Sequence, residues 1–592
     1  MPTAILTGLP VPGSPLAGEL RSLGFEVRPA AGPEDVSAAL GAVPADQRVA
    51  VVDSAFVGHL HALRLALTDP RFDACAVTGA FAVQPGARAA LDKAAATAGH
   101  GPAPYPDLLA AEVEGAGTAV QRPELGTLVA AVPATDAEHR AAAAAVAAVD
   151  DEAVRLRTAV KSRDGFFTTF FISPYSRYIA RWCARRGLTP NQVTTASLIT
   201  ALIAAGCAAT GERWGYVAAG VLLLVSFVLD CTDGQLARYS LQYSTMGAWL
   251  DATFDRAKEY SFYAGLALGA ARNGDDVWAL ALGSMILMTC RHVVDFAFNE
   301  ANHDATANTS PTAALSDKLD SVGWTVWVRR MIILPIGERW AMIAVLTAVT
   351  TPRTVFYALL AGCAFGALYT TAGRVLRSLT RKAIRTDRAA QALADLADSG
   401  VLAWTGSPRR TKRRPNFESV GLALAGSVLM AGGAVTRDFG TPWLVGTAVG
   451  YVFFAGAAVA GPLKGPLDWL IPPLFRFAEY ATVLALAAKA DVPGALPAAF
   501  GLVAAVAYHH YDTVYRIRGG SGAPPHWLVR TIGGHEGRVL LTVVLAVVLP
   551  RDAFPVALTA MAVFVALVVL VESIRFWVSS GAPAVHDEGE PA

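Results

Sequence analysis

Charged side chains are scarce in this chain of 592 residues. Asp, Glu, Lys and Arg make up 16% of it, whereas soluble proteins carry about 25%. Apolar residues make up 54%, and the mean hydropathy is +0.41. This composition excludes a disordered chain, argues against a wholly soluble enzyme and predicts an integral membrane protein. The formal net charge of +1 gives no general attraction to nucleic acid, so no nucleic-acid partner is expected.

Paired cysteines are also missing. The six cysteines contain no C-x-x-C pair, and most of them lie in apolar stretches. We therefore interpret them as small core residues rather than as disulfides or zinc ligands.

Residues 1–155 have no apolar run long enough to span a bilayer, and no basic segment followed by an apolar core, as in a signal peptide. Short β-like runs alternate there with alanine-rich helical stretches. This alternation predicts a Rossmann-like α/β soluble domain, with a parallel sheet covered by helices on both faces. The expected strand runs are Thr3–Gly8, Glu26–Pro29, Arg48–Asp53 and Ala74–Val83.

Two weaker signals lie in this domain. The loop Gly8–Pro15 follows the first strand run and precedes a helix, where a phosphate could bind. It has neither the Walker lysine nor the G-x-G-x-x-G spacing. His59 and His61 flank one leucine, which leaves two interpretations open: a metal site, or ordinary histidines of the fold.

Apolar segments recur from Thr194 onward in two sets of six, which predicts membrane domains over 160–380 and 416–580. The expected spans lie near 191–209, 214–238, 247–270, 277–298, 337–351, 353–376, 418–434, 441–461, 468–488, 494–515, 536–550 and 553–577.

The two sets are separated by a polar, basic linker over 381–415. Because positively charged loops stay on the cytoplasmic side, we expect this linker to be cytoplasmic. Six spans in each half then place the N-terminal domain and the C-terminus on the same side of the cell membrane. The basic residues of this region are Arg374, Arg377, Arg381, Lys382, Arg385, Arg388, Arg409, Arg410, Lys412, Arg413 and Arg414.

Four aspartates occupy the end of one expected span and the start of the next. Asp230 and Asp233 are three residues apart, and Asp251 and Asp255 are four apart, so each pair lies on one helical face. Carboxylates at membrane depth are costly unless they face a cavity and bind cations. Oxygen ligands favour hard cations such as Mg²⁺ or Mn²⁺.

Small and basic residues lie between these aspartates. Gly234 and Ala237 keep the helix face small, so that a substrate or a neighbouring helix can approach. Arg238 can neutralise a phosphate. The segment therefore combines the expected metal ligands with a place for a phosphorylated substrate.

The aspartates and their neighbours match the pattern D-x2-D-G-x2-A-R-x8-G-x3-D-x3-D in every fixed letter. Over about 164–380 the chain therefore resembles the CDP-alcohol phosphotransferase (CDP-alcohol phosphatidyltransferase) family. The strings Thr189–Thr194 and Pro335–Arg339 also look like that family.

The resemblance implies a dimeric bundle of six membrane helices that displaces CMP from a CDP-linked donor with an alcohol. Asp230, Asp233, Asp251 and Asp255 would hold two divalent cations, Mg²⁺ or Mn²⁺. Asp255 would also be the general base. The residues implied to line the CDP pocket are Gly234, Ala237, Arg238, Gly247, Asn191 and Thr194.

The acceptor is less defined. Arg256 and Arg291 are candidate ligands for a phosphorylated acceptor such as inositol phosphate, with CDP-diacylglycerol as donor in phospholipid synthesis. The N-terminal domain loosely resembles the nucleotidyltransferase domain that precedes the membrane domain of some inositol-phosphate enzymes. It has neither that family's G-x-G-x-R loop nor its lysine, which predicts a degenerate domain. Soluble CDP-inositol as donor, a transporter and a non-catalytic scaffold are the alternatives.

The sequence of the second membrane half resembles a degenerate duplicate of the first. Similar strings occur in the same order, which predicts a duplication; a wholly unrelated membrane domain is the alternative. In this alignment Ile471 and Phe475 stand where Asp251 and Asp255 stand, so the copy is expected to be inactive. The hypothesis places it where the family's second protomer would lie and leaves the oligomeric state open. The matched strings are Arg256–Tyr260 with Arg476–Tyr480, His292–Asp295 with His509–Asp512, and Gly337–Arg339 with Glu536–Arg538.

Overall fold

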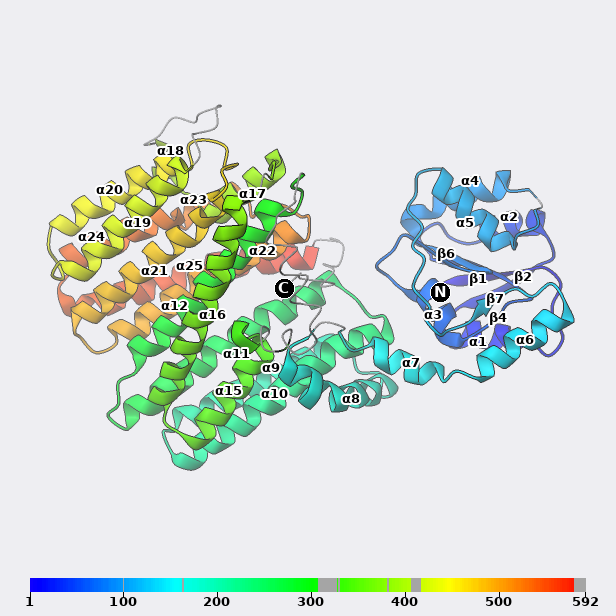
Figure 1. The fold of residues 1–592 in the computed structure, drawn as a ribbon, viewed down its shortest axis with the longest axis horizontal. Helices are drawn as coiled ribbons and strands as arrows, with labels where there is room; N and C mark the ends of the chain where they lie inside the picture. Colours follow the sequence, from blue (N-terminus) through cyan, green and yellow to red (C-terminus); the bar gives the residue numbers. More distant parts are fainter. Residues whose placement is uncertain are drawn as a thin grey trace. The chain divides into compact units, whose positions relative to one another are not determined.

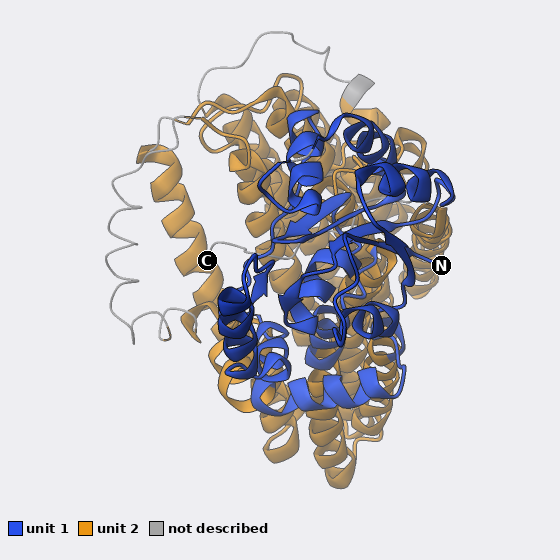
Figure 2. Ribbon diagram, turned by 90° about the vertical axis from the view of Figure 1, so that its right-hand side faces the viewer, with its two compact units in different colours: residues 1–163, 173–192, 231–244 blue, residues 164–172, 193–230, 245–592 orange. Residues whose placement is uncertain are grey.

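The structure is a computed structural model that describes residues 1–99, 101–161, 164–306, 327, 331–380, 383–405 and 417–579. It divides into two compact units (Figure 2). The first unit comprises residues 1–163, 173–192 and 231–244, and it contains the β-sheet. The second comprises residues 164–172, 193–230 and 245–592, and it contains most of the apolar helices.

The N-terminal domain is built on a five-stranded sheet in the order β2-β1-β3-β6-β5. Strands form at every expected run, but the expectation of a parallel sheet is wrong. Only the β1–β2 and β1–β3 pairs are parallel, whereas β6 is antiparallel to both β3 and β5. The run expected as one strand is a hairpin, because Gly79 (φ +76°) allows the chain to turn within it. The strands are β1 (Thr3–Thr7), β2 (Glu26–Ala30), β3 (Val49–Asp53), β5 (Ala74–Val77) and β6 (Ala80–Val83).

Helices cover both faces of this sheet, as expected for an α/β domain (Figure 1). Ile5 and Val51 join a core with α2, α4 and α5, whereas their neighbours Ala4 and Val52 join a second core with α1 and α3. The alternation follows from the two-residue period of a strand. The helices are α1 (Leu16–Ser22), α2 (Pro33–Gly41), α3 (Leu60–Thr68), α4 (Arg88–Thr97) and α5 (Tyr105–Gly115), followed by α6 (Asp136–Ala147) and α7 (Asp151–Thr158); β4 (Val57–Gly58) and β7 (Ala130–Ala131) form a small separate sheet.

Each of the twelve expected apolar segments coincides with a helix. The first membrane half consists of α9 (Pro190–Ala209), α10 (Arg213–Ser240), α11 (Thr245–Arg272), α12 (Trp278–Asn302), α15 (Ile336–Val349) and α16 (Pro352–Thr380). The second membrane half consists of α19 (Glu418–Thr436), α20 (Trp443–Ala458), α21 (Ile471–Ala490), α22 (Ala495–Arg518), α24 (Gly534–Val548) and α25 (Phe554–Ser579), with the short α23 (His526–Thr531) before α24.

Eight helices in the described part of the chain are long and apolar enough to cross a membrane. They comprise α9, α10, α12 and α16 of the first half, with α19 and the segments containing α21, α24 and α25 of the second. The protein is therefore a multi-pass membrane protein. That all twelve helices cross the bilayer stays a prediction.

Two of the remaining helices lie within the predicted linker. They are α17 (Asp387–Ala397) and α18 (Val401–Thr405), and α17 packs against α12, α21 and α22. The described part of this linker is thus folded onto the membrane helices. Its basic run from Arg409 to Arg414 lies outside the described residues. One further helix, α8 (Ser173–Arg185), precedes α9.

Candidate active site

The four aspartates lie on two consecutive helices. Asp230 and Asp233 belong to the last turns of α10, and Asp251 and Asp255 to the first turns of α11. Helix α10 ends in a tight reversal, where Leu241 has a positive φ of 53° and the amide of Gln242 donates to the carbonyl of Ala237 at 3.0 Å. This C-terminal turn returns the chain at once into α11.

Three of the aspartates form a group, here called the acidic site: Asp230, Asp233 and Asp251. Each offers one carboxylate oxygen, and these oxygens lie within 4.8 Å of one another. An oxygen-only donor set of this kind fits hard divalent cations. Such cations bind carboxylate oxygens at about 2.0–2.6 Å, the shorter distances being those of Mg²⁺. The chemistry of the donor set therefore fits the cation that the family resemblance implies.

Asp255 stands beside this group and is paired with a lysine that sequence reasoning missed. The Nζ atom of Lys258 lies 2.8 Å from Asp255 Oδ1 and also contacts Asp230 Oδ1. The lysine side chain is 1% exposed, and its Nζ lies 3.3 Å from Ser197 Oγ. A buried ammonium between two carboxylates offsets their mutual repulsion. Its position three residues after Asp255 was the only signal in the sequence.

The residues expected around the donor are positioned by local structure. Helix α9 begins with a capping box, because Thr189 Oγ1 accepts from the amide of Gln192 (3.3 Å) and Gln192 Oε1 accepts from the amide of Thr189 (2.9 Å). Asn191 and Thr194 lie in the first turns of this helix, and Thr194 is buried.

The arginine of the signature folds back over its glycine. A Cβ atom on Gly234 would meet the guanidinium of Arg238 at 3.5 Å. Arg238 Nε donates to the carbonyl of Ala159 at 2.6 Å. Ala237 lies one residue before Arg238 on α10, and Gly247 lies in the first turn of α11. The guanidinium of Arg238 therefore lies against the helix surface at Gly234.

The two candidate acceptor ligands have partners of their own. Arg256 Nη1 donates to Glu259 Oε2 at 2.7 Å, and Arg339 Nε lies 3.3 Å from Glu259 Oε1. These three buried residues are called the first charge cluster. Arg291 Nη2 donates to the carbonyl of Ile333. Both arginines are buried, but their hydrogen bonds run to other groups than the acidic site.

The second membrane half contains a matching arrangement. Arg476 Nη1 donates to Glu479 Oε2 at 2.7 Å, and Arg538 Nε donates to Glu479 Oε1 at 2.6 Å. These three residues, called the second charge cluster, are also buried, and Asp398 lies 2.8 Å from Arg538 Nη2. Ile471 and Phe475 are fully buried at the positions aligned with Asp251 and Asp255.

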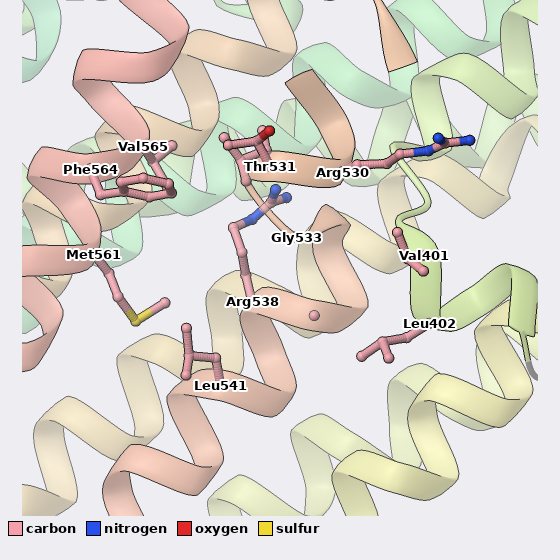
Figure 3. A pocket seen from close by; sticks show the side chains of 12 residues that line it. Val401, Leu402, Arg530, Thr531, Gly533, Arg538, Leu541, Met561, Phe564 and Val565 are labelled. Carbon is pink, nitrogen blue, oxygen red and sulfur yellow. The ribbon is translucent and has the colours of Figure 1, made fainter. Parts of the chain in front are cut away.

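A cavity of about 300 Å³ lies beside the second charge cluster (Figure 3). Arg538 and Arg530 contribute its charged groups, and Leu541, Met561 and Phe564 are among its apolar walls. None of its lining residues is acidic, so it has no means of holding a divalent cation through carboxylates.

The two N-terminal histidines are both buried, and His59 is bonded within the fold. His59 Nδ1 accepts from the amide of Val129 at 2.8 Å, and its Nε2 lies 3.1 Å from the carbonyl oxygen of Val146. Burial lowers the pKa of His61 to about 4. The use of both ring nitrogens of His59 in the fold favours ordinary histidines over a metal site. The loop Gly8–Pro15 leads into a helix of only seven residues.

Comparison with known families assigns the two membrane halves to different family models. Residues 187–359 match the CDP-alcohol phosphatidyltransferase family, and residues 387–592 match a family of unknown function (DUF5941). The segment that carries the acidic site is thus similar to the CDP-alcohol phosphatidyltransferase family, and the predicted resemblance is confirmed.

Curated relatives agree with this assignment. An archaetidylinositol phosphate synthase of Pyrococcus horikoshii is 33% identical over 115 residues, which are 19% of this chain and 58% of the relative. A bifunctional IPC transferase and DIPP synthase of Aquifex aeolicus is 28% identical over 204 residues, which are 34% of this chain and 45% of the relative. A phosphatidylinositol phosphate synthase of Mycolicibacterium smegmatis is 35% identical over 123 residues, which are 20% of this chain and 53% of the relative. The chain therefore spans about half the length of these relatives.

Proposed function

We propose that this chain is an integral membrane CDP-alcohol phosphotransferase, which displaces CMP from a CDP-linked donor with the hydroxyl group of an alcohol. The observation that carries the proposal is the acidic site. Three aspartates of the family's signature bring carboxylate oxygens within 4.8 Å of one another. They do so within the segment that matches the family.

The residues of the site divide the chemical work. Asp230, Asp233 and Asp251 would hold Mg²⁺ or Mn²⁺, and Asp255 completes the proposed set of ligands for two cations. Bound cations stabilise the negative charge of the pyrophosphate as it is cleaved. Lys258 offsets the charge of Asp230 and Asp255 and holds the two carboxylates in place.

The transfer itself needs one base and one leaving group. Asp255 removes the proton of the acceptor hydroxyl, and the hydroxyl oxygen attacks the phosphorus that carries the donor's alcohol. The bond from that phosphorus to the bridging oxygen breaks, and CMP leaves with the electron pair. The guanidinium of Arg238 contributes a positive charge for the donor phosphates.

Inositol phosphate is the proposed acceptor, and CDP-diacylglycerol the proposed donor, in phospholipid synthesis. The names of the relatives, which include phosphatidylinositol phosphate and archaetidylinositol phosphate synthases, support this choice. Of the two arginines expected to bind the acceptor phosphate, Arg291 stays the proposed ligand; Arg256 pairs with Glu259 on the other side of α11 from the aspartates, and we interpret it as structural. The alternative keeps the chemistry but takes soluble CDP-inositol as donor.

We further propose that the second membrane half is an inactive copy of the first. The matched charge clusters support this. A likeness one position out of the sequence alignment also supports it. Glu338 accepts from the amide of Phe167 (3.2 Å), and Glu536 accepts from the amide of Ala403 (3.1 Å). Each glutamate lies in the first turn of its helix. The N-terminal domain is proposed to be a cytoplasmic, degenerate nucleotidyltransferase-like domain, with the linker and the C-terminus on the same side.

Release of CMP from purified full-length protein tests the function. We expect release with CDP-diacylglycerol and inositol phosphate, its loss in EDTA and its return with Mg²⁺ or Mn²⁺. A parallel assay with CDP-inositol separates the two donors. Absence of CMP release with every donor and acceptor pair would contradict the proposal and favour a transporter or scaffold.

A further inference from the structure

Helix α11 carries two stripes of side chains on opposite faces. Residues spaced by four and then three positions share one face of a helix that has 3.6 residues per turn. The stripe that contributes to the catalytic centre consists of Asp251, Asp255 and Lys258. The stripe on the other side of the helix consists of Trp249, Thr253 and Arg256.

The second stripe is covered by aromatic side chains of the second membrane half, where α11 packs against α22 and α25. Trp577 of α25 stacks on Trp249, with ring centroids 6.1 Å apart and planes at 19°. The guanidinium of Arg256 lies 5.2 Å from the ring centroid of Tyr511 of α22. We call Trp577 and Tyr511 the aromatic clamp.

Both members of the aromatic clamp are themselves held in place. Asp512 Oδ1 accepts from Trp577 Nε1 at 2.7 Å and from Ser573 Oγ at 2.7 Å. Arg516 pairs with the other oxygen of Asp512 at 2.8 Å. The Tyr511 hydroxyl is hydrogen-bonded to His292 Nδ1 of α12. Buried bonds to charged groups fix the position of an aromatic ring more strongly than packing alone.

We propose that the second membrane half positions α11 for metal binding through the aromatic clamp. This role goes beyond the proposal that the second half is an inactive copy, because an inactive copy need not affect the acidic site. It rests on the proposed function, because the acidic site is taken to hold Mg²⁺ or Mn²⁺. Trp577 and Tyr511 are positioning residues, since they touch α11 and not the reacting groups.

The physical reason is the narrow tolerance of a metal site. Asp230 and Asp233 come from α10, whereas Asp251 comes from α11, so the position of α11 sets the spacing of the oxygens. Ligand distances in a metal site must be correct to within about 0.2 Å. Loss of the support behind α11 is therefore expected to weaken metal binding by about 10-fold or more, as the loss of other supporting residues does.

Direct Mn²⁺ binding to the purified full-length protein, followed by electron paramagnetic resonance, tests the proposal. We expect Trp577→Leu and Tyr511→Leu to weaken Mn²⁺ binding by about 10-fold. The Mn²⁺ concentration needed for half-maximal CMP release should rise with it, and excess Mn²⁺ should restore part of the rate. Trp577→Phe keeps an aromatic face against Trp249 and should retain most of the affinity.

Trp469→Leu is the matched control. Trp469 is also a buried tryptophan of the second half that meets the first half, but it packs on Phe298 of α12 (5.3 Å between centroids) and donates to Ser378 Oγ of α16 (3.0 Å). Its removal creates a similar cavity without uncovering α11. We expect Mn²⁺ affinity to stay at the wild-type value in this variant.

The outcomes separate the two proposals. Equal Mn²⁺ affinities in Trp577→Leu and Trp469→Leu, whether both reduced or both unchanged, would overturn the clamp. Wild-type protein that binds Mn²⁺ but releases no CMP would overturn the proposed function and leave the clamp testable by binding. Wild-type protein that binds no Mn²⁺ would overturn both. If the leucine variants do not fold, Tyr511→Phe and Trp577→Phe provide the graded comparison.

Discussion

In the first membrane half Glu259 lies between Arg256 and Arg339, and in the second half Glu479 lies between Arg476 and Arg538. The two clusters use the same residue types, the same three-residue step along the helix and the same 2.7 Å contact between Nη1 and Oε2. Each joins the third helix of its half to the fifth. We interpret both clusters as structural, because they occur with and without the acidic site.

The two halves differ on the neighbouring face of that third helix. Helix α11 carries Asp255 and, three residues later, Lys258, whereas α21 carries Phe475 and Ala478 at the aligned positions. Apolar side chains on α21 thus replace both members of the Asp255–Lys258 pair, and Phe475 stacks on His535 with centroids 4.2 Å apart. The comparison separates residues that stabilise the helix packing from residues that serve chemistry.

The largest effect is expected at Asp255. Asp255→Asn keeps the shape of the side chain and one oxygen ligand but removes the proton acceptor. Loss of a general base costs about 10²–10⁴-fold in rate, so CMP release should collapse while binding of the CDP-donor survives. The rate should be measured over a range of Mg²⁺ concentrations. Recovery of most of the rate at high Mg²⁺ would mean that Asp255 is only a metal ligand.

Lys258→Met should destabilise the first half strongly. Removal of one partner from a buried ion pair typically costs about 3–5 kcal/mol, and here two carboxylates lose the same ammonium. Mn²⁺ should recover part of the lost free energy of unfolding, because a bound cation can offset the same charges. Thermal unfolding with and without Mn²⁺ measures this. A loss that is identical in both conditions would contradict a role for Lys258 at the metal site.

Arg339→Ala and Arg538→Ala form a matched pair across the two halves. Each leaves a buried glutamate without one arginine, and each is expected to lower the free energy of unfolding by about 3–5 kcal/mol. Mn²⁺ affinity should fall only in Arg339→Ala, because Glu259 lies on α11 next to the ligands. Equal losses of Mn²⁺ affinity would mean that the second charge cluster also supports the acidic site.

Much of this arrangement could be predicted from the sequence, because local signals determine it. Each of the twelve expected apolar runs coincides with a helix, and eight helices of the described residues are long and apolar enough to cross a membrane. The family pattern grouped four aspartates, and three of them, Asp230, Asp233 and Asp251, lie together in the structure. Long-range contacts were missed. Lys258 acquires its partner Asp230 only when α10 packs on α11. The hairpin at Gly79 was read as one strand because Val77 and Thr78 before that glycine, and Phe81 and Val83 after it, have high β propensity.

The aromatic clamp was missed for a related reason. Trp249 and Trp577 lie in different halves of the chain, and a tryptophan in an apolar helix is an ordinary core residue by its sequence alone. The same holds for Tyr511, whose neighbours His510 and Asp512 are also buried. Only the packing of α11 against α22 and α25 shows that these side chains meet the helix that carries two of the four aspartates.

The smallest effect is expected at Phe475, the counterpart of Asp255 in the second half. Phe475→Leu keeps an apolar side chain in a fully buried position but removes the ring that stacks on His535, and the loss of such an aromatic pair costs about 0.5–1.5 kcal/mol. Mn²⁺ affinity and the rate of CMP release should stay at wild-type values, because Phe475 is not a metal ligand and packs on Tyr451 and His535 of the second half. Thermal unfolding, a Mn²⁺ titration and the rate of CMP release, measured as for Asp255→Asn, provide the comparison. A large loss of CMP release in a folded Phe475→Leu protein would show that the two aligned positions serve one site, and the separation of structural from chemical residues would then be wrong.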